Sequence, residues 1–279
     1  MTGVGPGGPD APGGRFAGRA VLVAGSTGMA AAAARAIAAE GGAVFVVSRT
    51  AEHCIDLATL IRADGGRADA FAADLADEAA VDEAFAAFRE RFDRLDGVFA
   101  AAGISGRRFG DAPLHEATLD GWETVLASNA RSTFLVCRAA VRTMLDQEPG
   151  TGGRGAIVTM SSRLATHPAA EHFATHAYAA SKGAIESFSR AVAAYYAPDG
   201  IRVNVLAPGL VATPMSRRAQ ADEAVLRYLA AKQPLAGGPI ETDDTTGTVL
   251  FLLGDESRMI TGQVVAVDAG WSVSEPSAS

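Results

Sequence analysis

The residues most able to do chemistry in this chain are a tyrosine and a lysine four positions apart, Tyr178 and Lys182. Positions i and i+4 share one face of a helix, so a phenol and an ammonium there can reach one site. A nearby cation favours the phenolate and lowers the phenol pKa from its usual value of about 10. Bringing that pKa near neutral pH takes roughly 4 kcal/mol, and a general acid/base works best there. The pair therefore predicts that Tyr178 transfers a proton.

The same spacing occurs again at Tyr228 and Lys232, so spacing alone does not identify the reactive pair. Tyr178 comes after an apolar run at 156–161 that is typical of a buried strand. Tyr228 instead lies in a polar, charge-rich stretch with no strand immediately before it. We therefore expect Tyr178 and Lys182 to form the reactive site, and Tyr228 and Lys232 to lie on the surface of a helix.

Polar residues at two other places could assist this pair. Ser162 directly follows the apolar run at 156–161, where a hydroxyl can donate to a substrate carbonyl oxygen as that oxygen gains negative charge. Ser161 is the alternative donor, and either serine could instead cap the strand end. Asn129 stands in a long helical stretch although Asn is a poor helix former. We expect a specific hydrogen bond there, either to a water beside Lys182 or within the core.

The elements that must position these residues alternate along the chain. Short, apolar, Val-rich runs predict strands covered on both faces, and Ala-rich stretches between them predict helices. This alternation predicts right-handed βαβ units in a Rossmann-type, doubly wound α/β domain with a seven-stranded parallel sheet and helices on both faces. Ligands of such sheets bind beyond the carboxyl ends of the strands. The predicted strands are 20–24, 44–48, 68–73, 97–101, 156–161, 202–207 and 264–267, and the helices include 31–40, 78–91, 119–146 and 179–196.

A glycine-rich turn follows the first predicted strand. Gly25 and Gly28 stand three apart, and the next stretch is helical. Glycines there let a pyrophosphate approach the free N–H groups at a helix N-terminus, and Ala30 or Ala31 allows close packing of helix on strand. Methyltransferases also use such loops, and a tight turn alone would look the same. The cofactor type therefore stays open at this point.

The second predicted strand ends in Ser48, Arg49 and Thr50. An NAD site usually has a carboxylate about 20 residues after the glycine turn, and this carboxylate binds the ribose hydroxyls. An arginine at that place instead suits a 2′-phosphate. The residue types therefore favour NADP(H) over NAD, unless Arg49 is only a solvated surface residue. Asp74 and Leu75 follow the third strand, where the carboxylate could meet the adenine amino group or cap the next helix.

With these residues placed, the chain resembles the short-chain dehydrogenase/reductase family over residues 14–273. The ordered motifs are the glycine turn, Asp74-Leu75, Ala102-Gly103, Asn129, Ser162, Tyr178 with Lys182, Asn204 with Pro208-Gly209 and Thr213, and TGQVVAVDAGW near the end. The most similar members are 3-oxoacyl-carrier-protein reductases and polyketide ketoreductases, and the family is usually tetrameric or dimeric. The resemblance implies a homotetramer or homodimer acting on a small carbonyl or alcohol substrate.

The resemblance also assigns roles to individual residues. Tyr178 would be the proton donor and acceptor, Lys182 would bind the nicotinamide ribose, Ser162 would orient the substrate carbonyl, and Asn129 would support a proton-relay water. Pro208, Gly209 and Thr213 would flank the nicotinamide carboxamide. The predicted cofactor-binding residues are Gly25, Ser26, Thr27, Gly28, Met29, Ser48, Arg49, Thr50, Asp74, Leu75, Ala101, Ala102, Gly103, Tyr178, Lys182, Pro208, Gly209, Val211 and Thr213.

The chain departs from the family pattern in three places. The glycine turn reads AGSTGMA, one residue shorter than usual with Ala for its last glycine, and the usual NNAG is Ala100-Ala-Ala-Gly103. The gap between Ser162 and Tyr178 is longer than usual and enlarges a loop at 163–177. Its histidines could line the substrate pocket, lie on the surface or bind a metal, although the predicted chemistry needs no metal. Residues 213–239 would form a substrate lid.

Composition limits the remaining possibilities. With 279 residues of which 48% are hydrophobic, the chain can bury one large core, which we assign to residues 16–273. The Gly- and Pro-rich residues 1–15 are expected to form a flexible arm and 274–279 a polar tail. A net charge of −8 argues against nucleic acid, and no apolar run is long enough for a membrane helix. Two cysteines fit a reducing cytoplasm.

These observations predict an NADP(H)-dependent oxidoreductase that interconverts a carbonyl and a secondary alcohol, with Tyr178 as general acid/base. Two alternatives remain. The same site could use NAD or perform isomerisation or cyclisation, or the chain could be a non-catalytic dinucleotide-binding regulator. The altered glycine turn favours the regulator, whereas the intact Asn129, Ser162, Tyr178 and Lys182 favour an enzyme.

Overall fold

The computed structural model describes residues 14–275, so most of the predicted arm at 1–15 and of the tail at 274–279 lies outside the described residues. Its centre is a seven-stranded sheet in the order β3-β2-β1-β4-β5-β6-β7, with every neighbouring pair parallel. The predicted Rossmann-type sheet is thus confirmed. The strands are β1 (Ala20–Ala24), β2 (Ala43–Ser48), β3 (Arg67–Ala72), β4 (Gly97–Ala100), β5 (Gly155–Met160), β6 (Ile201–Pro208) and β7 (Val264–Val267).

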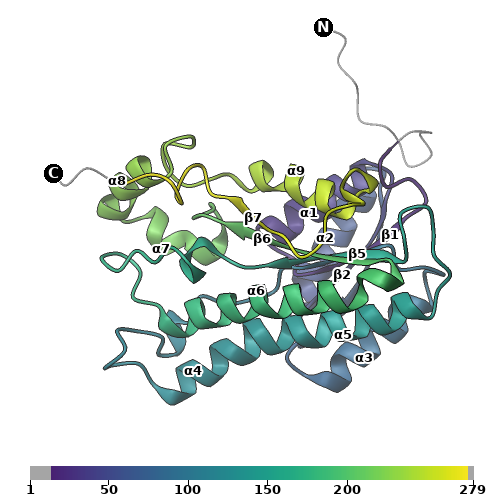
Figure 1. The fold of residues 1–279 in the computed structure, drawn as a ribbon, viewed down its shortest axis with the longest axis horizontal. Helices are drawn as coiled ribbons and strands as arrows, with labels where there is room; N and C mark the ends of the chain where they lie inside the picture. Colours follow the sequence, from purple (N-terminus) through teal and green to yellow (C-terminus); the bar gives the residue numbers. More distant parts are fainter. Residues whose placement is uncertain (1–13, 276–279) are drawn as a thin grey trace, which may run out of the picture.

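Helices cover both faces of this sheet (Figure 1). On one face lie α1 (Met29–Ala39), α2 (Ala51–Ala63) and α9 (Thr242–Leu253). On the other lie α3 (Glu78–Arg89), α4 (Leu119–Leu126), α5 (Ser132–Leu145) and α6 (His176–Tyr196). The short helices α7 (Arg217–Gln220) and α8 (Glu223–Lys232) lie between β6 and α9 in the sequence. The strand order reverses between β1 and β4, and a doubly wound sheet binds its ligand at this switch point.

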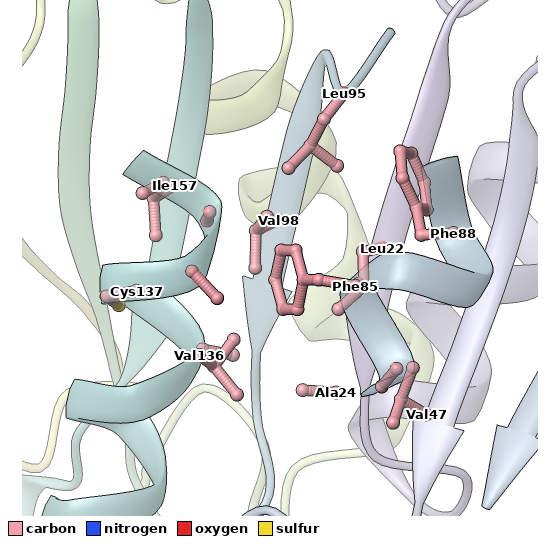
Figure 2. Close-up of a cluster of buried hydrophobic side chains, with 14 of the residues drawn as sticks. Leu22, Ala24, Val47, Phe85, Phe88, Leu95, Val98, Val136, Cys137 and Ile157 are labelled. Atoms are coloured by element: carbon pink, nitrogen blue, oxygen red, sulfur yellow. The ribbon is translucent and has the colours of Figure 1, made fainter. Parts of the chain in front are cut away.

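Each helical layer buries its own hydrophobic core against the sheet. Figure 2 shows the core that α3 and α5 form with the sheet, in which Phe85 and Val136 face Val98 of β4. The second core packs α1, α2 and α9 on the opposite face, where Ile37, Ile61 and Leu252 are buried. Central strands such as β1 are buried along their whole length, whereas the edge strand β3 is only partly covered. Burial on both faces explains why the central strands read as continuous apolar runs.

Parts of the helical layers differ from the sequence-based expectation. The helix expected over 119–146 is interrupted by a π-helical segment, Ala127–Arg131, between α4 and α5. Within it the Asn129 carbonyl accepts hydrogen bonds from the Thr133 and Ser132 hydroxyls at 2.8 and 3.2 Å. Such segments are frequent at functional sites. Helix α2 was not among the predicted ranges, although Cys54, Leu57, Ala58 and Ile61 bury one face of it at helical spacing.

Among residues 14–275, no helix has the length and apolar character needed to cross a membrane. Cys54 and Cys137 are both free and buried, in helices on opposite faces of the sheet.

Candidate active site

A cleft lies at the carboxyl ends of β1, β2 and β4, where a doubly wound sheet binds its ligand. The structure brings together most of the predicted cofactor residues here, from the glycine turn, the end of β2 and the loops after β3 and β4. The predicted residues that line the cleft are Gly25, Ser26, Thr27, Gly28, Met29, Ser48, Arg49, Thr50, Asp74, Leu75, Ala101, Ala102, Gly103 and Thr213.

The glycine turn leaves the N-terminus of α1 open toward the cleft. Gly28 is the N-cap of α1, has a φ of 56°, and offers no side chain to satisfy the first N–H groups. A Cβ at Gly28 would come 3.0 Å from Thr213 Cγ2, and one at Gly25 would come 2.8 Å from Ala30 Cβ. The shorter turn therefore still requires both glycines. Free N–H groups at a positive helix end fit a pyrophosphate.

The end of β2 forms the next part of the cleft wall. The Ser48 hydroxyl lies 2.7 Å from Ser26 Oγ and 3.0 Å from Cys54 Sγ, which fixes Ser48 between the glycine turn and α2. Arg49 and Thr50 are exposed beside it, at the start of α2. His53, in the first turn of α2, also lines the cleft. Sequence reasoning missed this histidine, whose signal is its position just after Arg49 and Thr50.

Asp74 lies in the cleft rather than at a helix cap. Its carboxylate accepts the Ala76 N–H at 3.0 Å within the turn after β3. The N-cap of α3 is Asp77, which accepts the Ala80 N–H at 2.9 Å. The alternative in which Asp74 caps the next helix is therefore wrong.

Lys182 is buried at the end of the cleft, with 3% of its surface exposed. Its ammonium donates to the Met160 carbonyl at 2.9 Å and lies 5.6 Å from the centre of the Tyr178 ring. A Cβ at Gly103 would come 3.5 Å from Lys182 Nζ and 2.9 Å from Asn129 Oδ1, so glycine keeps the end of β4 close to both side chains. Met160 and Gly103 line the cleft, so Lys182 adjoins it.

Burial is the largest cause of the pKa shift of both Lys182 and Tyr178. Burial lowers the pKa of Lys182 from 10.5 to about 8. Burial also raises the pKa of Tyr178, and a hydrogen bond with the Ser162 hydroxyl opposes this rise in part. The lowering of the Tyr178 pKa expected from Lys182 together with an oxidised nicotinamide stays a prediction. Desolvation outweighs the Ser162 hydrogen bond, so the pKa of Tyr178 lies above its ordinary value.

The structure distinguishes the two serines after β5. Ser161 donates to the Lys182 carbonyl at 3.1 Å and to Glu186 Oε1 at 2.7 Å, so its hydroxyl is committed to α6. Ser162 instead accepts the Leu164 N–H at 3.2 Å, which leaves its own proton available, and its hydroxyl influences the Tyr178 phenol. Of these two serines, Ser162 is the one whose hydroxyl lies beside the Tyr178 phenol.

Asn129 is fully buried in the π-helical segment and makes the specific contacts expected of it. Its Oδ1 accepts the Ile104 N–H at 2.8 Å, and its Nδ2 donates to the Ile104 carbonyl at 3.1 Å and to Ser181 Oγ at 3.0 Å. The side-chain amide thus joins the loop after β4 to α6. The water predicted beside Lys182 stays a prediction.

Other predicted cofactor residues stand outside the cleft lining that residues 14–275 form, namely Tyr178, Lys182, Pro208, Gly209 and Val211. Pro208 ends β6, and Val211 is buried in a short bridge with Ile240. Gln233 is fully buried, and its Oε1 accepts the Leu210 N–H at 2.6 Å. This hydrogen bond connects the end of α8 to the segment that follows β6. The sequence contained no clear signal for Gln233, since the contact joins residues 23 positions apart, one of them before the predicted lid.

The second Tyr–Lys pair lies in α8 and is not simply a surface pair. Tyr228 is half-buried, with its ring centre 4.5 Å from that of His172 and 5.8 Å from that of Trp271. Lys232 donates to the Ser274 carbonyl. These contacts pack α8 against the enlarged loop, so this tyrosine serves the packing of the predicted lid.

The enlarged loop at 163–177 is held by contacts from its start to its end. Arg163 forms a buried ion pair with Asp268 at 3.3 Å, and Trp271 Nε1 donates to the His167 carbonyl at 3.2 Å. At the other end His176 Nδ1 lies 3.0 Å from the Ala112 carbonyl oxygen. The predicted histidines therefore contact separate parts of the molecule.

Comparison with known proteins agrees with this geometry. The family model described as "Enoyl-(Acyl carrier protein) reductase" matches residues 23–272. D-threitol dehydrogenase of Mycolicibacterium smegmatis is 33% identical over 93% of this chain and 95% of its own length. The short-chain reductase protein NovJ of Streptomyces niveus is 36% identical over 90% of this chain and 92% of its own length.

A solved structure supports the same assignment. A gluconate 5-dehydrogenase from Burkholderia cenocepacia, in complex with NADP and tartrate, matches with a TM-score of 0.84 and 30% identity, over 92% of this chain and 96% of that chain. The parallel sheet, the cleft at its switch point and these matches along nearly the whole chain agree. The chain is therefore an oxidoreductase of alcohols or carbonyls that belongs to the short-chain dehydrogenase/reductase family.

Proposed function

We propose that this protein is an NADP(H)-dependent oxidoreductase that interconverts a carbonyl and a secondary alcohol, with Tyr178 as general acid/base. The observation that carries the proposal is the buried Lys182 ammonium, 2.9 Å from the Met160 carbonyl oxygen and 5.6 Å from the Tyr178 ring centre, at the end of the cleft. A buried charge is costly, and a protein keeps one where it serves a function.

The residues of the cleft fit a dinucleotide. The open N-terminus of α1 at Gly28 suits the pyrophosphate, and the exposed Arg49, with Thr50 and His53 nearby, suits a 2′-phosphate. The carboxylate that would repel that phosphate is replaced by Ser48. The NADP in the related gluconate 5-dehydrogenase structure supports the same choice.

Proton transfer follows from the surroundings of Tyr178. A bound nicotinamide would supply the hydride to the carbonyl carbon, or accept it in the reverse direction. Tyr178 gives its phenolic proton to the carbonyl oxygen as the alcohol forms, and takes it back in oxidation. Ser162 donates a hydrogen bond to the same oxygen while negative charge develops there. Burial raises the pKa of Tyr178, so the phenol carries the proton that carbonyl reduction consumes.

Fluorescence titration with NADPH and NADH, followed by turnover of a panel containing gluconate, D-threitol and a 3-oxoacyl thioester, tests the proposal. We expect tighter binding of NADPH and a Tyr178→Phe variant that binds NADPH normally but loses about 10²- to 10⁴-fold in kcat. Equal or tighter binding of NADH would show that the cofactor is NAD rather than NADP. Full turnover by Tyr178→Phe would overturn the acid/base assignment. Binding with no turnover, or with isomerisation or cyclisation only, would favour the alternative functions.

The proposal includes a homodimer or homotetramer. Phe134 is 42% exposed and lines an apolar hollow with Phe188 between α5 and α6. Exposed aromatic surface of this kind is typical of an association site. Light scattering of the purified protein should give a multiple of the 28.5 kDa chain mass, and a monomeric mass would contradict this part of the proposal.

A further inference from the structure

Helix α6, which carries Tyr178 and Lys182, is capped by a residue far from it in the sequence. The N-cap of α6 is Thr175, but its hydroxyl donates to Asp111 Oδ2 at 2.6 Å rather than capping the helix. The first N–H groups of a helix need an acceptor, and normally the N-cap side chain accepts from the second or third residue. In α6 these positions are Ala177 and Tyr178.

Asp111 accepts both of these N–H groups. Its Oδ1 accepts from Ala177 and its Oδ2 from Tyr178, each at 3.0 Å. Asp111 is only 2% exposed and belongs to the loop between β4 and α4. A buried carboxylate with three donors at the positive end of a 21-residue helix is strongly held in place. The next residue adds a further contact, since the Ala112 carbonyl oxygen lies 3.0 Å from His176 Nδ1.

The same loop also reaches the other side of the Tyr178 backbone. Asn129 binds the Ile104 backbone near the start of the loop and donates to Ser181 Oγ at 3.0 Å. Ser181 in turn donates to the Tyr178 carbonyl at 2.7 Å. The N–H and the C=O of Tyr178 are therefore both held by side chains that connect to one loop.

We propose that Asp111 is a positioning residue, which fixes the Tyr178 phenol for proton transfer by holding the first turn of α6. This inference rests on the proposed role of Tyr178. Loss of the carboxylate would release the Tyr178 backbone while leaving the nucleotide end of the cleft intact, because the glycine turn and the β2 end contact other elements. Displacement of a reacting group by about 1 Å can lower a rate on the order of 100-fold.

The test compares Asp111→Ala and Asp111→Asn with Asp77→Ala. Asp77 caps α3 through the Ala80 N–H but is exposed, so it reports the effect of losing an aspartate cap away from Tyr178. We expect kcat to fall about 100-fold in Asp111→Ala and about 10-fold in Asp111→Asn, whose amide keeps one acceptor oxygen. We also expect an unchanged NADPH Kd and a larger solvent deuterium isotope effect on kcat, because proton transfer becomes slower.

The outcomes distinguish a role of Asp111 in positioning Tyr178 from a role only in the stability of the fold. In Asp77→Ala we expect a lower Tm with an unchanged kcat and isotope effect. The inference is overturned if folded Asp111→Ala keeps the kcat of the wild type, or if NADPH affinity falls as far as kcat. If Asp111→Ala does not fold, Asp111→Asn decides by the same criteria. Full turnover by Tyr178→Phe would instead refute the proposed role of Tyr178 as general acid/base. This result is distinct from one that refutes only the positioning role of Asp111.

Discussion

Replacing Lys182 with methionine should stabilise the folded protein at neutral pH while removing a proposed catalytic group. Burial lowers the pKa of Lys182 from 10.5 to about 8. This shift means that the buried ammonium lowers the free energy of unfolding by roughly 3 kcal/mol at pH 7. Methionine has a similar length and no charge, so this cost disappears. The Met160 carbonyl loses its 2.9 Å donor, at a cost of about 1 kcal/mol. We therefore expect a gain of about 2 kcal/mol in the free energy of unfolding at pH 7.

The pH dependence of this gain identifies its cause. The native pKa of Lys182 is below the unfolded value, so the unfolded chain binds more protons between pH 8 and 10.5. The stability of the wild type therefore rises through that window, whereas Lys182→Met lacks this contribution. Their difference should shrink by about 2 kcal/mol between pH 7 and pH 9.5, as measured by urea unfolding.

The control for this experiment is Lys232→Met, at the other of the chain's two lysines. Lys232 is half-buried and donates to the Ser274 carbonyl, so its replacement reports the general effect of removing a lysine. A difference between wild type and Lys182→Met that stays constant from pH 7 to pH 9.5 would refute the reasoning, because a desolvated ammonium must titrate in that range.

Other changes to the site have equally specific expected results. Ser162→Ala should lower kcat by about 10²-fold, measured by steady-state kinetics, because it loses one hydrogen-bond donor. Ser161→Ala should mainly lower Tm, measured by thermal melts, because the Ser161 hydroxyl is bonded to α6. Arg49→Ala should weaken NADPH binding about 10-fold or more and NADH binding little, measured by fluorescence titration, and equal losses would show that Arg49 does not contact a 2′-phosphate. Asp268→Asn should destabilise the fold by about 3 kcal/mol in urea, since it leaves the buried Arg163 without its ion pair.

Most of the fold could be predicted from the sequence because each central strand is buried on both faces. Burial makes strands such as β1 apolar throughout, and the predicted and observed bounds of β1 and β7 coincide. Helix α2 was not among the predicted ranges, and the exposed apolar residues Ile55 and Leu60 obscure the helical spacing of its buried face. The π-helical segment inside the helix expected at 119–146 was also missed, since it is defined by backbone hydrogen bonds such as that from the Ser132 N–H to the Ala127 carbonyl rather than by residue type.

The candidate site was predictable where its residues lie close to strand ends. Ser48 and Thr50 stand at or just after the end of β2, and the structure places both in the cleft. The choice between Ser161 and Ser162 needed the structure, because neighbouring residues of an extended chain point in opposite directions. The structure was also needed for the lysine, whose ammonium is buried beside the Met160 carbonyl and whose pKa is lowered by desolvation.

Contacts between distant segments account for what the sequence could not show. Asp111 stands 67 positions before Tyr178, and Asn129 stands 52 before Ser181, so neither contact belongs to a local motif. Both nevertheless meet at the first turns of α6, where the two substrate-side loops also join through Thr175 and Asp111. A change in either loop is therefore transmitted to the backbone that carries the phenol. Loop length after β4 and β5 can then vary between relatives only if a carboxylate or an equivalent acceptor continues to satisfy the N-terminus of this helix.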